Sequence, residues 1–212
     1  MTGSPFDIRG FKLFKTALDA EQQAAMAVGI RSVVAAAPLF SPQTPYGKPM
    51  SVRMTSAGQY GWYADRSGYR YVATHPNGQA WPDIPGSVLR VWDEVTGLMR
   101  RPDCCLINYY SSEARMGMHR DCDEADFGFP VLSISLGDEG LFRIGNQTRG
   151  GKTASVWLQS GDVVLMGGAA RLTYHGLDRT RPGTSSLLKN GGRINLTLRV
   201  VMAAVGEWEC PL

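Results

Sequence analysis

Apolar residues recur at helical spacing in two stretches of the N-terminal half of the chain. Asp19 and Gln22 form a capping-box pattern, after which apolar side chains return every three or four residues until Pro38. Because a capping box supplies hydrogen-bond partners to first-turn amides, this pattern predicts a helix that begins at Asp19 and stops at Pro38. A second amphipathic stretch predicts a helix over Ser87–Met99, which Pro102 ends.

Beyond the second predicted helix the pattern changes to short apolar runs separated by glycine-containing turns. Such runs, rich in Val, Ile, Leu and Tyr, are typical of β-strands. The predicted strands are Cys104–Tyr110, Val131–Leu136, Leu141–Ile144, Ala154–Leu158, Asp162–Met166, Tyr174–Leu177 and Ile194–Val201. Many short strands at regular spacing favour a sandwich or barrel wound as a jelly roll. The predicted fold is therefore mainly β, with helices first and a two-sheet barrel after them.

The composition is that of an ordinary globular domain. The 212 residues include 43% hydrophobic and 19% charged residues, enough to bury a core. No apolar stretch approaches the roughly 20 residues of a membrane helix, and the N-terminal sequence lacks a signal-peptide pattern. We therefore expect a soluble, cytoplasmic protein without a membrane partner. The net charge of +3 permits a nucleic-acid partner without requiring one.

The four cysteines indicate reduced thiols rather than disulfides or a zinc site. Cys104 and Cys105 are adjacent in an apolar run, Cys122 follows an aspartate, and Cys210 is almost terminal. None of them forms the Cys-x-x-Cys pair that is typical of zinc sites, so free thiols in a reducing compartment are the simpler interpretation.

Histidine is scarce in this chain, and two of the three histidines stand in a chemically informative pattern. His119 precedes Asp121 by two residues, so in an extended segment both side chains project to the same face. His175 follows an apolar run and is able to supply a third ligand from a neighbouring strand. Two histidines and one carboxylate are the ligand set of non-haem iron oxygenases. The alternative is a surface His–Asp pair beside a packed His175, and His75 is expected to be an ordinary turn residue.

The last predicted strand alternates strictly between polar and apolar residues. Arg193, Asn195, Thr197 and Arg199 share one face, and the intervening Ile and Leu residues share the other. Two arginines directed into a barrel are costly unless anions neutralise them, and a dicarboxylate such as 2-oxoglutarate offers two carboxylates. The alternative is a solvated polar face of an edge strand.

Two further patterns lie upstream of the His-x-Asp motif. Asn108 and Tyr110 share a face of their strand and are able to donate to the same oxyanion. The run from Tyr60 to Tyr71 is rich in aromatic residues and contains Trp62 and Tyr69. Such rings are suited to stacking on nucleic-acid bases, and the alternative is a packed β-hairpin core.

Taken in order, these motifs resemble the AlkB family of nucleic-acid dealkylating dioxygenases. The resemblance rests on Asn108-x-Tyr110, His119-x-Asp121-x-Asp123, Gly161-Asp-Val-Val164, Arg171-Leu-x-Tyr174-His175-Gly176 and Arg193-x-Asn195-Leu-Thr197-x-Arg199, and upstream on Met54-Thr55, Gly61-Trp62 and Gly68-Tyr69. It implies a double-stranded β-helix. Residues 104–212 would be the catalytic core, and residues 1–103 an N-terminal helical and nucleotide-recognition extension packed on it, in one structural domain overall.

The resemblance also assigns roles to individual residues. The iron(II) ligands and catalytic centre would be His119, Asp121 and His175. The 2-oxoglutarate pocket would consist of Arg193 at the distal carboxylate, Arg199 at the carboxylate next to the keto group, and Asn108, Tyr110 and Asn195 as hydrogen-bond partners. The substrate would contact Trp62 by stacking, Tyr69 at the nucleic-acid backbone, Met54 in the pocket, Asp123 near the cationic base, and Arg149, either as a pocket lid or as a surface charge. One departure from the bacterial members is Met166, where they carry a large aromatic residue.

The activity implied by the resemblance is oxidative dealkylation of bases such as N1-methyladenine and N3-methylcytosine. The reaction would use Fe(II), O2 and 2-oxoglutarate and release formaldehyde, succinate and CO2, with alkylated DNA or RNA as the partner and a monomer as the working form. Two alternatives remain: a 2-oxoglutarate oxygenase acting on a protein or lipid, and a catalytically silent nucleic-acid-binding module.

Overall fold

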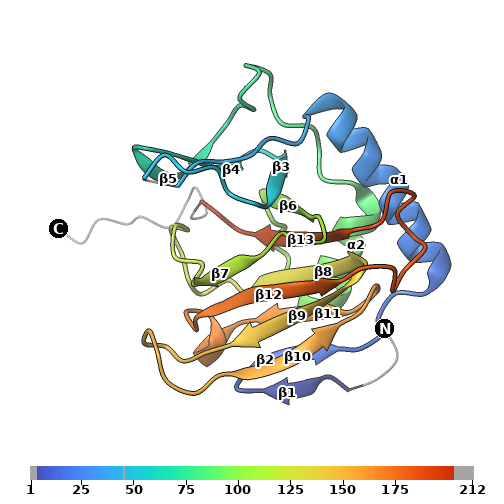
Figure 1. The fold of residues 1–212 in the computed structure, drawn as a ribbon, viewed down its shortest axis with the longest axis vertical. Coiled ribbons are helices and arrows are strands. Elements are labelled where there is room, and N and C mark those ends of the chain that lie inside the picture. The colour runs from blue at the N-terminus through green and yellow to red at the C-terminus, as the bar shows by residue number, and fades with distance from the viewer. Residues whose placement is uncertain (1–3, 45, 203–212) are drawn as a thin grey trace.

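Two antiparallel sheets form the framework of the protein in the computed structural model, which describes residues 4–44 and 46–202. The larger sheet has the strand order β1-β2-β11-β8-β13-β6-β3, and the smaller sheet has the order β10-β9-β12-β7. A separate two-stranded sheet, β4-β5, lies at the end of the molecule opposite β1 and β2 (Figure 1). The arrangement is a double-stranded β-helix with flanking helices, which confirms the predicted fold class.

The strands of the larger sheet come from both halves of the chain. They are β1 (Phe6–Ile8), β2 (Phe11–Phe14), β3 (Arg53–Gly58), β6 (Cys104–Tyr110), β8 (Val131–Gly137), β11 (Val163–Met166) and β13 (Arg193–Arg199). The smaller sheet contains β7 (Met116–His119), β9 (Glu139–Ile144), β10 (Ala154–Leu158) and β12 (His175–Arg181), and the separate hairpin contains β4 (Gly61–Asp65) and β5 (Gly68–Val72). The N-terminal segment is joined to the barrel because β2 pairs with β11 and β3 pairs with β6.

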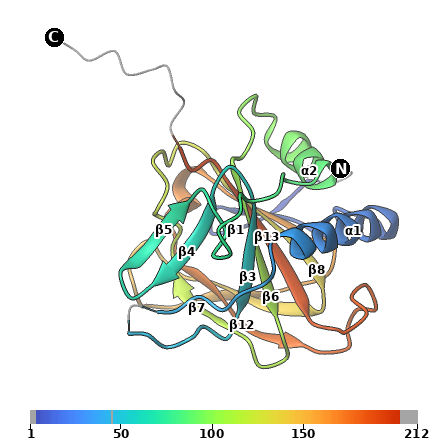
Figure 2. The same ribbon diagram turned by 90° about the horizontal axis from the view of Figure 1, so that it is seen from above.

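The two helices lie on one side of the sheets, and the β4–β5 hairpin lies on the other (Figure 2). Helix α1 (Ala20–Ala36) begins as predicted, since the Asp19 carboxylate accepts from the Gln22 amide and the Gln22 side chain accepts from the Asp19 amide. Its buried side chains and those of α2 (Gly86–Thr96) pack against the apolar face of β6, β8 and β13. The helices therefore cover the outer face of the larger sheet and leave its inner face to the site.

The second helix is shorter than the sequence pattern predicts. It ends at Thr96 because Gly97 adopts the left-handed conformation, with φ of 63°, and donates its amide to the Asp93 carbonyl. Met99, which the prediction placed in this helix, is fully exposed. The predicted stop at Pro102 is therefore wrong, and the glycine is the actual stop signal.

All seven predicted strands are present, with β6 and β10 at the predicted bounds and the others shifted by one or a few residues. The largest difference is β12, which begins at His175 and continues to Arg181 rather than ending at Leu177. Six short strands, β1 to β5 and β7, were not predicted. They have three to six residues and carry polar or glycine residues inside them, so they lack the apolar runs that reveal a strand.

Strand β13 carries the alternation that the sequence predicts. Leu196 and Leu198 pack in the core beneath the helices, while Arg193, Thr197 and Arg199 are buried on the opposite face, between the two sheets. β13 is a central strand that pairs with β6 and β8, so the alternative of a solvated edge strand is wrong.

Within the part of the chain that the structure describes, neither helix has the length and apolar character needed to cross a membrane. Three of the predicted thiols are free cysteines: Cys104 and Cys105 are buried and Cys122 is exposed. The expectation for Cys210 lies outside the described residues.

Candidate functional site

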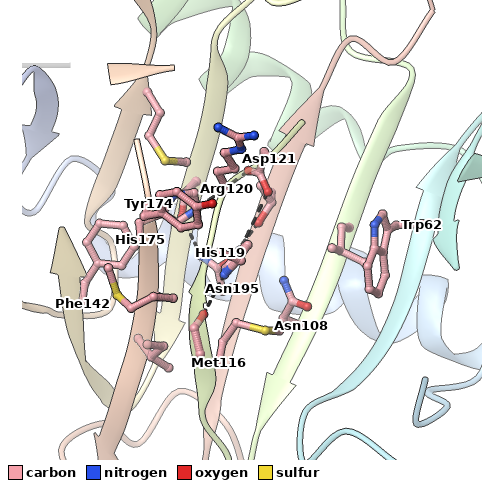
Figure 3. A pocket seen from close by; sticks show the side chains of 18 of the residues that line it. Trp62, Asn108, Met116, His119, Arg120, Asp121, Phe142, Tyr174, His175 and Asn195 are labelled. Atoms are coloured by element: carbon pink, nitrogen blue, oxygen red, sulfur yellow. Dashed lines mark hydrogen bonds and ion pairs between the residues drawn. The ribbon is translucent and has the colours of Figure 1, made fainter. Parts of the chain in front are cut away.

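A cavity of about 560 Å³ opens between the two sheets, beside the β4–β5 hairpin. Its lining contains every residue that the sequence analysis singled out as a site residue: Met54, Trp62, Tyr69, Asn108, Tyr110, His119, Asp121, Asp123, Arg149, His175, Arg193, Asn195 and Arg199. These residues come from strands and loops far apart in the sequence, and Figure 3 shows several of them around the cavity. The fold therefore gathers the predicted residues in one place.

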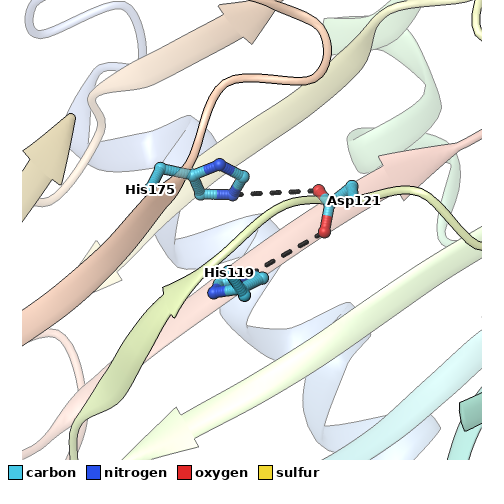
Figure 4. Close-up of side chains that lie close together, drawn as sticks. All are labelled: His119, Asp121 and His175. Atoms are coloured by element: carbon cyan, nitrogen blue, oxygen red, sulfur yellow. Dashed lines mark ion pairs between the residues drawn. The ribbon is translucent and has the colours of Figure 1, made fainter. Parts of the chain in front are cut away.

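His119, Asp121 and His175 form a cluster at one side of this cavity (Figure 4). His119 ends β7 and His175 begins β12, and the two residues are direct partners in the pairing of these strands. Gly176 allows this close approach, because a Cβ there would lie 2.7 Å from the Met116 carbonyl oxygen. One potential ligand atom from each residue of the cluster lies within 4.8 Å of the others.

The hydrogen bonds of the two imidazoles leave the same nitrogen of each ring facing Asp121. Nδ1 of His119 lies 2.9 Å from the Gly117 carbonyl oxygen, and Nδ1 of His175 lies 3.0 Å from the Thr173 carbonyl oxygen. A carbonyl oxygen only accepts, so both Nδ1 atoms carry a hydrogen and both Nε2 atoms keep a free lone pair. These Nε2 atoms lie 3.8 and 3.9 Å from the Asp121 carboxylate oxygens.

The charge states in the cluster suit a divalent cation. Burial, and then the neighbouring His119, lowers the pKa of His175 to about 4, so its imidazole is neutral at physiological pH. Burial alone would raise the pKa of Asp121, but Arg199 and the two histidines lower it below its ordinary value. Oδ2 of Asp121 is buried and has no hydrogen-bond partner among the described residues. A neutral His175, the Nε2 atom of His119 and an ionised carboxylate with an unused oxygen fit iron(II).

Arg193 lies deep in the cavity with only neutral partners. It is 1% exposed and donates to the Ser135 hydroxyl at 2.7 Å and to the carbonyl oxygens of Asp138 and Leu158, both at 3.2 Å. No carboxylate of the described residues pairs with it, and its Nε has no hydrogen-bond partner there. Burial lowers the pKa of Arg193 to about 10, so the guanidinium remains charged at neutral pH. A buried, uncompensated cation is suited to an anionic ligand.

Arg199 lies at the other end of the same strand face and joins the metal cluster to a buried acid. Its Nη2 lies 2.9 Å from Oδ1 of Asp121, and its Nε lies 3.2 Å from Oε1 of Glu124. Nη1 of Arg199 and Oδ1 of Asn108 are buried without a hydrogen-bond partner among the described residues. Nδ2 of Asn195 donates to the Ser133 hydroxyl at 2.6 Å. Unpaired donors, Nε of Arg193 and Nη1 of Arg199, therefore remain at both ends of the cavity, as a bound dicarboxylate requires.

The aromatic rings of the hairpin lie at the open side of the cavity. Trp62 and Tyr69 are stacked, with ring centroids 5.4 Å apart and ring planes 20° apart. The indole N–H of Trp62 donates to Oδ2 of Asp123 at 3.2 Å, and Tyr69 is 48% exposed. The hairpin exists, as the alternative interpretation expected, and Trp62 packs in part against a buried cluster that includes Met54, but both rings also line the cavity.

The remaining residues singled out in the sequence have clear positions. Met54 is buried in the cavity wall, and the guanidinium of Arg149 lies 5.2 Å from the ring centre of Tyr174. Met166 is also buried in the cavity wall. His75 lies in a turn outside the cluster, where it accepts the Asn77 amide hydrogen through Nδ1.

Glu124, Tyr71 and Arg171 form a network next to the cavity that was not predicted from the sequence. Glu124 is buried and accepts from the Tyr71 hydroxyl at 2.6 Å and from Nη2 of Arg171 at 2.9 Å. Arg171 also donates to the main-chain carbonyl of Asp121 at 2.7 Å. The one sequence signal for this network is the acidic run after His119, in which Asp121, Asp123 and Glu124 stand close together.

Comparison with known proteins identifies the family of this chain. The model of the 2OG-Fe(II) oxygenase superfamily matches residues 10–199 of the chain. The chain is 50% identical to the alpha-ketoglutarate-dependent dioxygenase AlkB homolog of Caulobacter vibrioides, over 91% of this chain and 88% of that protein. This chain belongs to the AlkB family of 2OG-Fe(II) oxygenases.

Two other relatives agree with this membership. AlkB of Escherichia coli is 36% identical over 80% of this chain and 81% of its own length. The solved structure of OsALKBH1 superposes with a TM-score of 0.76 at 28% identity, covering 93% of this chain and 99% of that one. The family is one of enzymes, dioxygenases that use Fe(II) and 2-oxoglutarate, and the His–Asp–His cluster provides a site for the metal.

Proposed function

We propose that this protein removes alkyl groups from damaged nucleic-acid bases, such as N1-methyladenine and N3-methylcytosine. The reaction consumes O2 and 2-oxoglutarate and releases formaldehyde, succinate and CO2. The observation that carries the proposal is the stacked Trp62–Tyr69 pair, which lines the same cavity as the His–Asp–His cluster. Stacking faces suit flat bases, and membership of the AlkB family agrees with this substrate.

In this proposal the iron is held by His119, Asp121 and His175, through the two Nε2 atoms and the carboxylate. When bound, iron(II) and 2-oxoglutarate supply the oxidising power that inserts an oxygen atom into a C–H bond of the alkyl group. Arg193 pairs with the distal carboxylate of 2-oxoglutarate. Support comes from its burial, its charge and its lack of a carboxylate partner in the described chain.

The carboxylate next to the keto group of 2-oxoglutarate is assigned to Arg199, whose guanidinium contacts Asp121. Asn108, Tyr110 and Asn195 complete this pocket with hydrogen bonds. Asn108 and Tyr110 project from β6 and Asn195 from β13, and Asn108 and Asn195 are direct partners in the pairing of these two strands. Since all five residues line one cavity, the cosubstrate is held against the larger sheet.

The substrate is assigned to the opposite side of the cavity. Trp62 stacks on the damaged base, Tyr69 contacts the nucleic-acid backbone, and Met54 lines the pocket. Asp123 holds the Trp62 indole and places a carboxylate where a cationic methylated base is favoured over a neutral one. Arg149 covers the cavity from the Tyr174 side. A base stacked inside a duplex does not reach such a cavity, so the enzyme flips the base out or acts on single strands.

The proposal extends to the form in which the protein works. We infer that the protein is cytoplasmic, because its free cysteines suit a reducing compartment. We also infer that it works as a monomer on alkylated DNA or RNA. We also infer that residues 1–103 and 104–212 act as one structural domain. The pairing of β2 with β11 and of β3 with β6 supports this, because it builds the N-terminal segment into the catalytic barrel.

Neither alternative function is favoured by the site. A silent binding module has no use for a complete ligand cluster together with two buried arginines. An oxygenase acting on a peptide or lipid has no use for stacked rings beside a carboxylate at the cavity mouth. The nucleic-acid substrate accounts for both halves of the cavity.

Replacing Trp62 with alanine is expected to raise KM for a single-stranded oligonucleotide containing 1-methyladenine by about 5- to 160-fold, because base stacking contributes roughly 1–3 kcal/mol. The apparent affinity for 2-oxoglutarate should stay unchanged. The matched control is Trp157→Ala on β10, where the ring packs against Arg181 instead. Steady-state kinetics on the oligonucleotide would check this, and an unchanged KM in Trp62→Ala would contradict the assigned substrate side.

A further inference from the structure

The β4–β5 hairpin that carries the stacked rings is a sheet of its own, so side-chain contacts with the barrel help to fix its position, beside main-chain hydrogen bonds at Tyr60 and Ala64. Trp62 and Tyr71 are direct cross-strand partners in this hairpin. Partners in an antiparallel pair project to the same face. Both side chains bond to the segment that follows Asp121, Trp62 to Asp123 at 3.2 Å and Tyr71 to Glu124 at 2.6 Å.

Glu124 is the shared partner of the hairpin and the catalytic centre. Its side chain is almost completely buried, and its two oxygens contact Tyr71, Arg171 and Arg199. Arg171 fixes the segment itself, because it bonds to both the Glu124 carboxylate and the Asp121 main-chain carbonyl. The contact from Tyr71 therefore ends on a rigid group.

Arg199 continues this network to the metal cluster. It contacts Glu124 through Nε and Asp121 through Nη2. A continuous chain of contacts therefore runs from the base-stacking hairpin, through Tyr71 and Glu124, to Arg199 and Asp121. Burial raises the pKa of Tyr71 well above its ordinary value, although the charge of Arg199 opposes this rise, so the hydroxyl remains a donor across the physiological pH range.

We propose that Tyr71 is a positioning residue whose hydrogen bond to Glu124 holds the Trp62 platform at a fixed place relative to the metal cluster. The inference rests on the proposed function. The position of Trp62 determines how often a base bound to it lies within reach of the metal cluster when 2-oxoglutarate is turned over. Without the bond the hairpin is less restrained, so 2-oxoglutarate is still consumed but fewer of these turnovers remove an alkyl group.

The test is Tyr71→Phe, which removes only the hydroxyl and keeps the ring. The matched control is Tyr63→Phe in the same hairpin, where the ring packs against Phe40 and projects to the other face. Both variants and the wild type are incubated with iron(II), 2-oxoglutarate and a single-stranded oligonucleotide carrying one 1-methyladenine. Succinate formed and bases demethylated are counted in the same reaction.

We expect the ratio of succinate to demethylated base to rise about tenfold in Tyr71→Phe, the order of magnitude for loss of a hydrogen bond to a charged group. The ratio should stay at the wild-type value in Tyr63→Phe, and KM for 2-oxoglutarate should be unchanged in both. A partly unfolded sample lowers both products together, so the ratio separates positioning from a general loss of structure.

Two results would overturn the inference while leaving the proposed function intact. One is a wild-type ratio in Tyr71→Phe. The other is a raised ratio together with a raised KM for 2-oxoglutarate, which would show that Tyr71 acts through Arg199 and not through the hairpin. A wild-type protein that consumes 2-oxoglutarate without removing the methyl group would instead overturn the proposed function, and the inference with it.

Discussion

Exchanging Asp121 for asparagine is expected to lower the affinity for iron(II) by more than a hundredfold and to abolish turnover of 2-oxoglutarate. The asparagine side chain is neutral, so the charged member of the cluster is lost while its shape is kept. Changing a group that merely supports a metal ligand already costs roughly 10- to 100-fold in metal affinity. Loss of a ligand should cost more. Equilibrium binding of iron(II) under anaerobic conditions, together with a succinate assay, would measure both effects.

The matched control for this exchange lies in the same segment of the chain. Asp126 uses its carboxylate to accept the Gly128 amide hydrogen at the surface, and Asp126→Asn keeps an acceptor oxygen there. This control should bind iron(II) like the wild type. If Asp121→Asn retained tight iron binding, the assignment of the carboxylate as a metal ligand would be wrong.

Replacing Arg193 with methionine is expected to weaken 2-oxoglutarate binding by at least about thirtyfold, because truncating one member of a buried charge pair costs roughly 2–5 kcal/mol. The free energy of unfolding without cosubstrate should stay the same or rise. The reason is that Arg193 is a buried cation with neutral partners only, and replacing a buried charge with an apolar group of similar volume is often neutral or stabilising.

Two measurements check the Arg193 prediction: 2-oxoglutarate titration of the iron-loaded protein, and chemical denaturation without the cosubstrate. Arg181→Met is the control, because Arg181 is an exposed residue on β12 that pairs with Glu139. Weaker 2-oxoglutarate binding together with an unchanged or higher free energy of unfolding would identify Arg193 as a ligand-binding arginine. A large loss of stability with unchanged 2-oxoglutarate binding would show instead that Arg193 is structural.

The polar residues that meet in the cavity were predictable from sequence because they follow the two-residue period of extended chain. That period places His119 and Asp121 together, and it turns Arg193 and Arg199 to one face of β13. The apolar residues on the opposite face of β13 then settle which face is buried beneath the helices. Local spacing was therefore sufficient for these residues.

The network behind the hairpin was not predictable, because its partners are distant in sequence. Tyr71 and Glu124 are 53 residues apart, and Trp62 and Asp123 are 61 apart. No periodic pattern links such positions. Their contacts depend on where the hairpin comes to rest on the barrel, and the short strands of the hairpin themselves lack an apolar run.

The remaining differences concern the ends of elements and the short strands. Helix α2 ends because Gly97 adopts a left-handed conformation, although the apolar pattern of the sequence continues to Met99. Strands β1 and β2 are only three and four residues long; β2 pairs with β11, more than a hundred residues later, and β1 pairs with β2. Sequence patterns therefore located the long elements and the chemistry, while tertiary pairing fixed the ends and the short strands.

The central claim is tested most directly by mass spectrometry of a single-stranded oligonucleotide carrying one 1-methyladenine. The oligonucleotide is incubated with the wild-type protein, iron(II), 2-oxoglutarate and O2, with Asp121→Asn in parallel. We expect loss of the methyl group and release of formaldehyde with the wild type only. Consumption of 2-oxoglutarate with the methyl group retained would contradict a nucleic-acid substrate, and the absence of any consumption would contradict the dioxygenase activity itself.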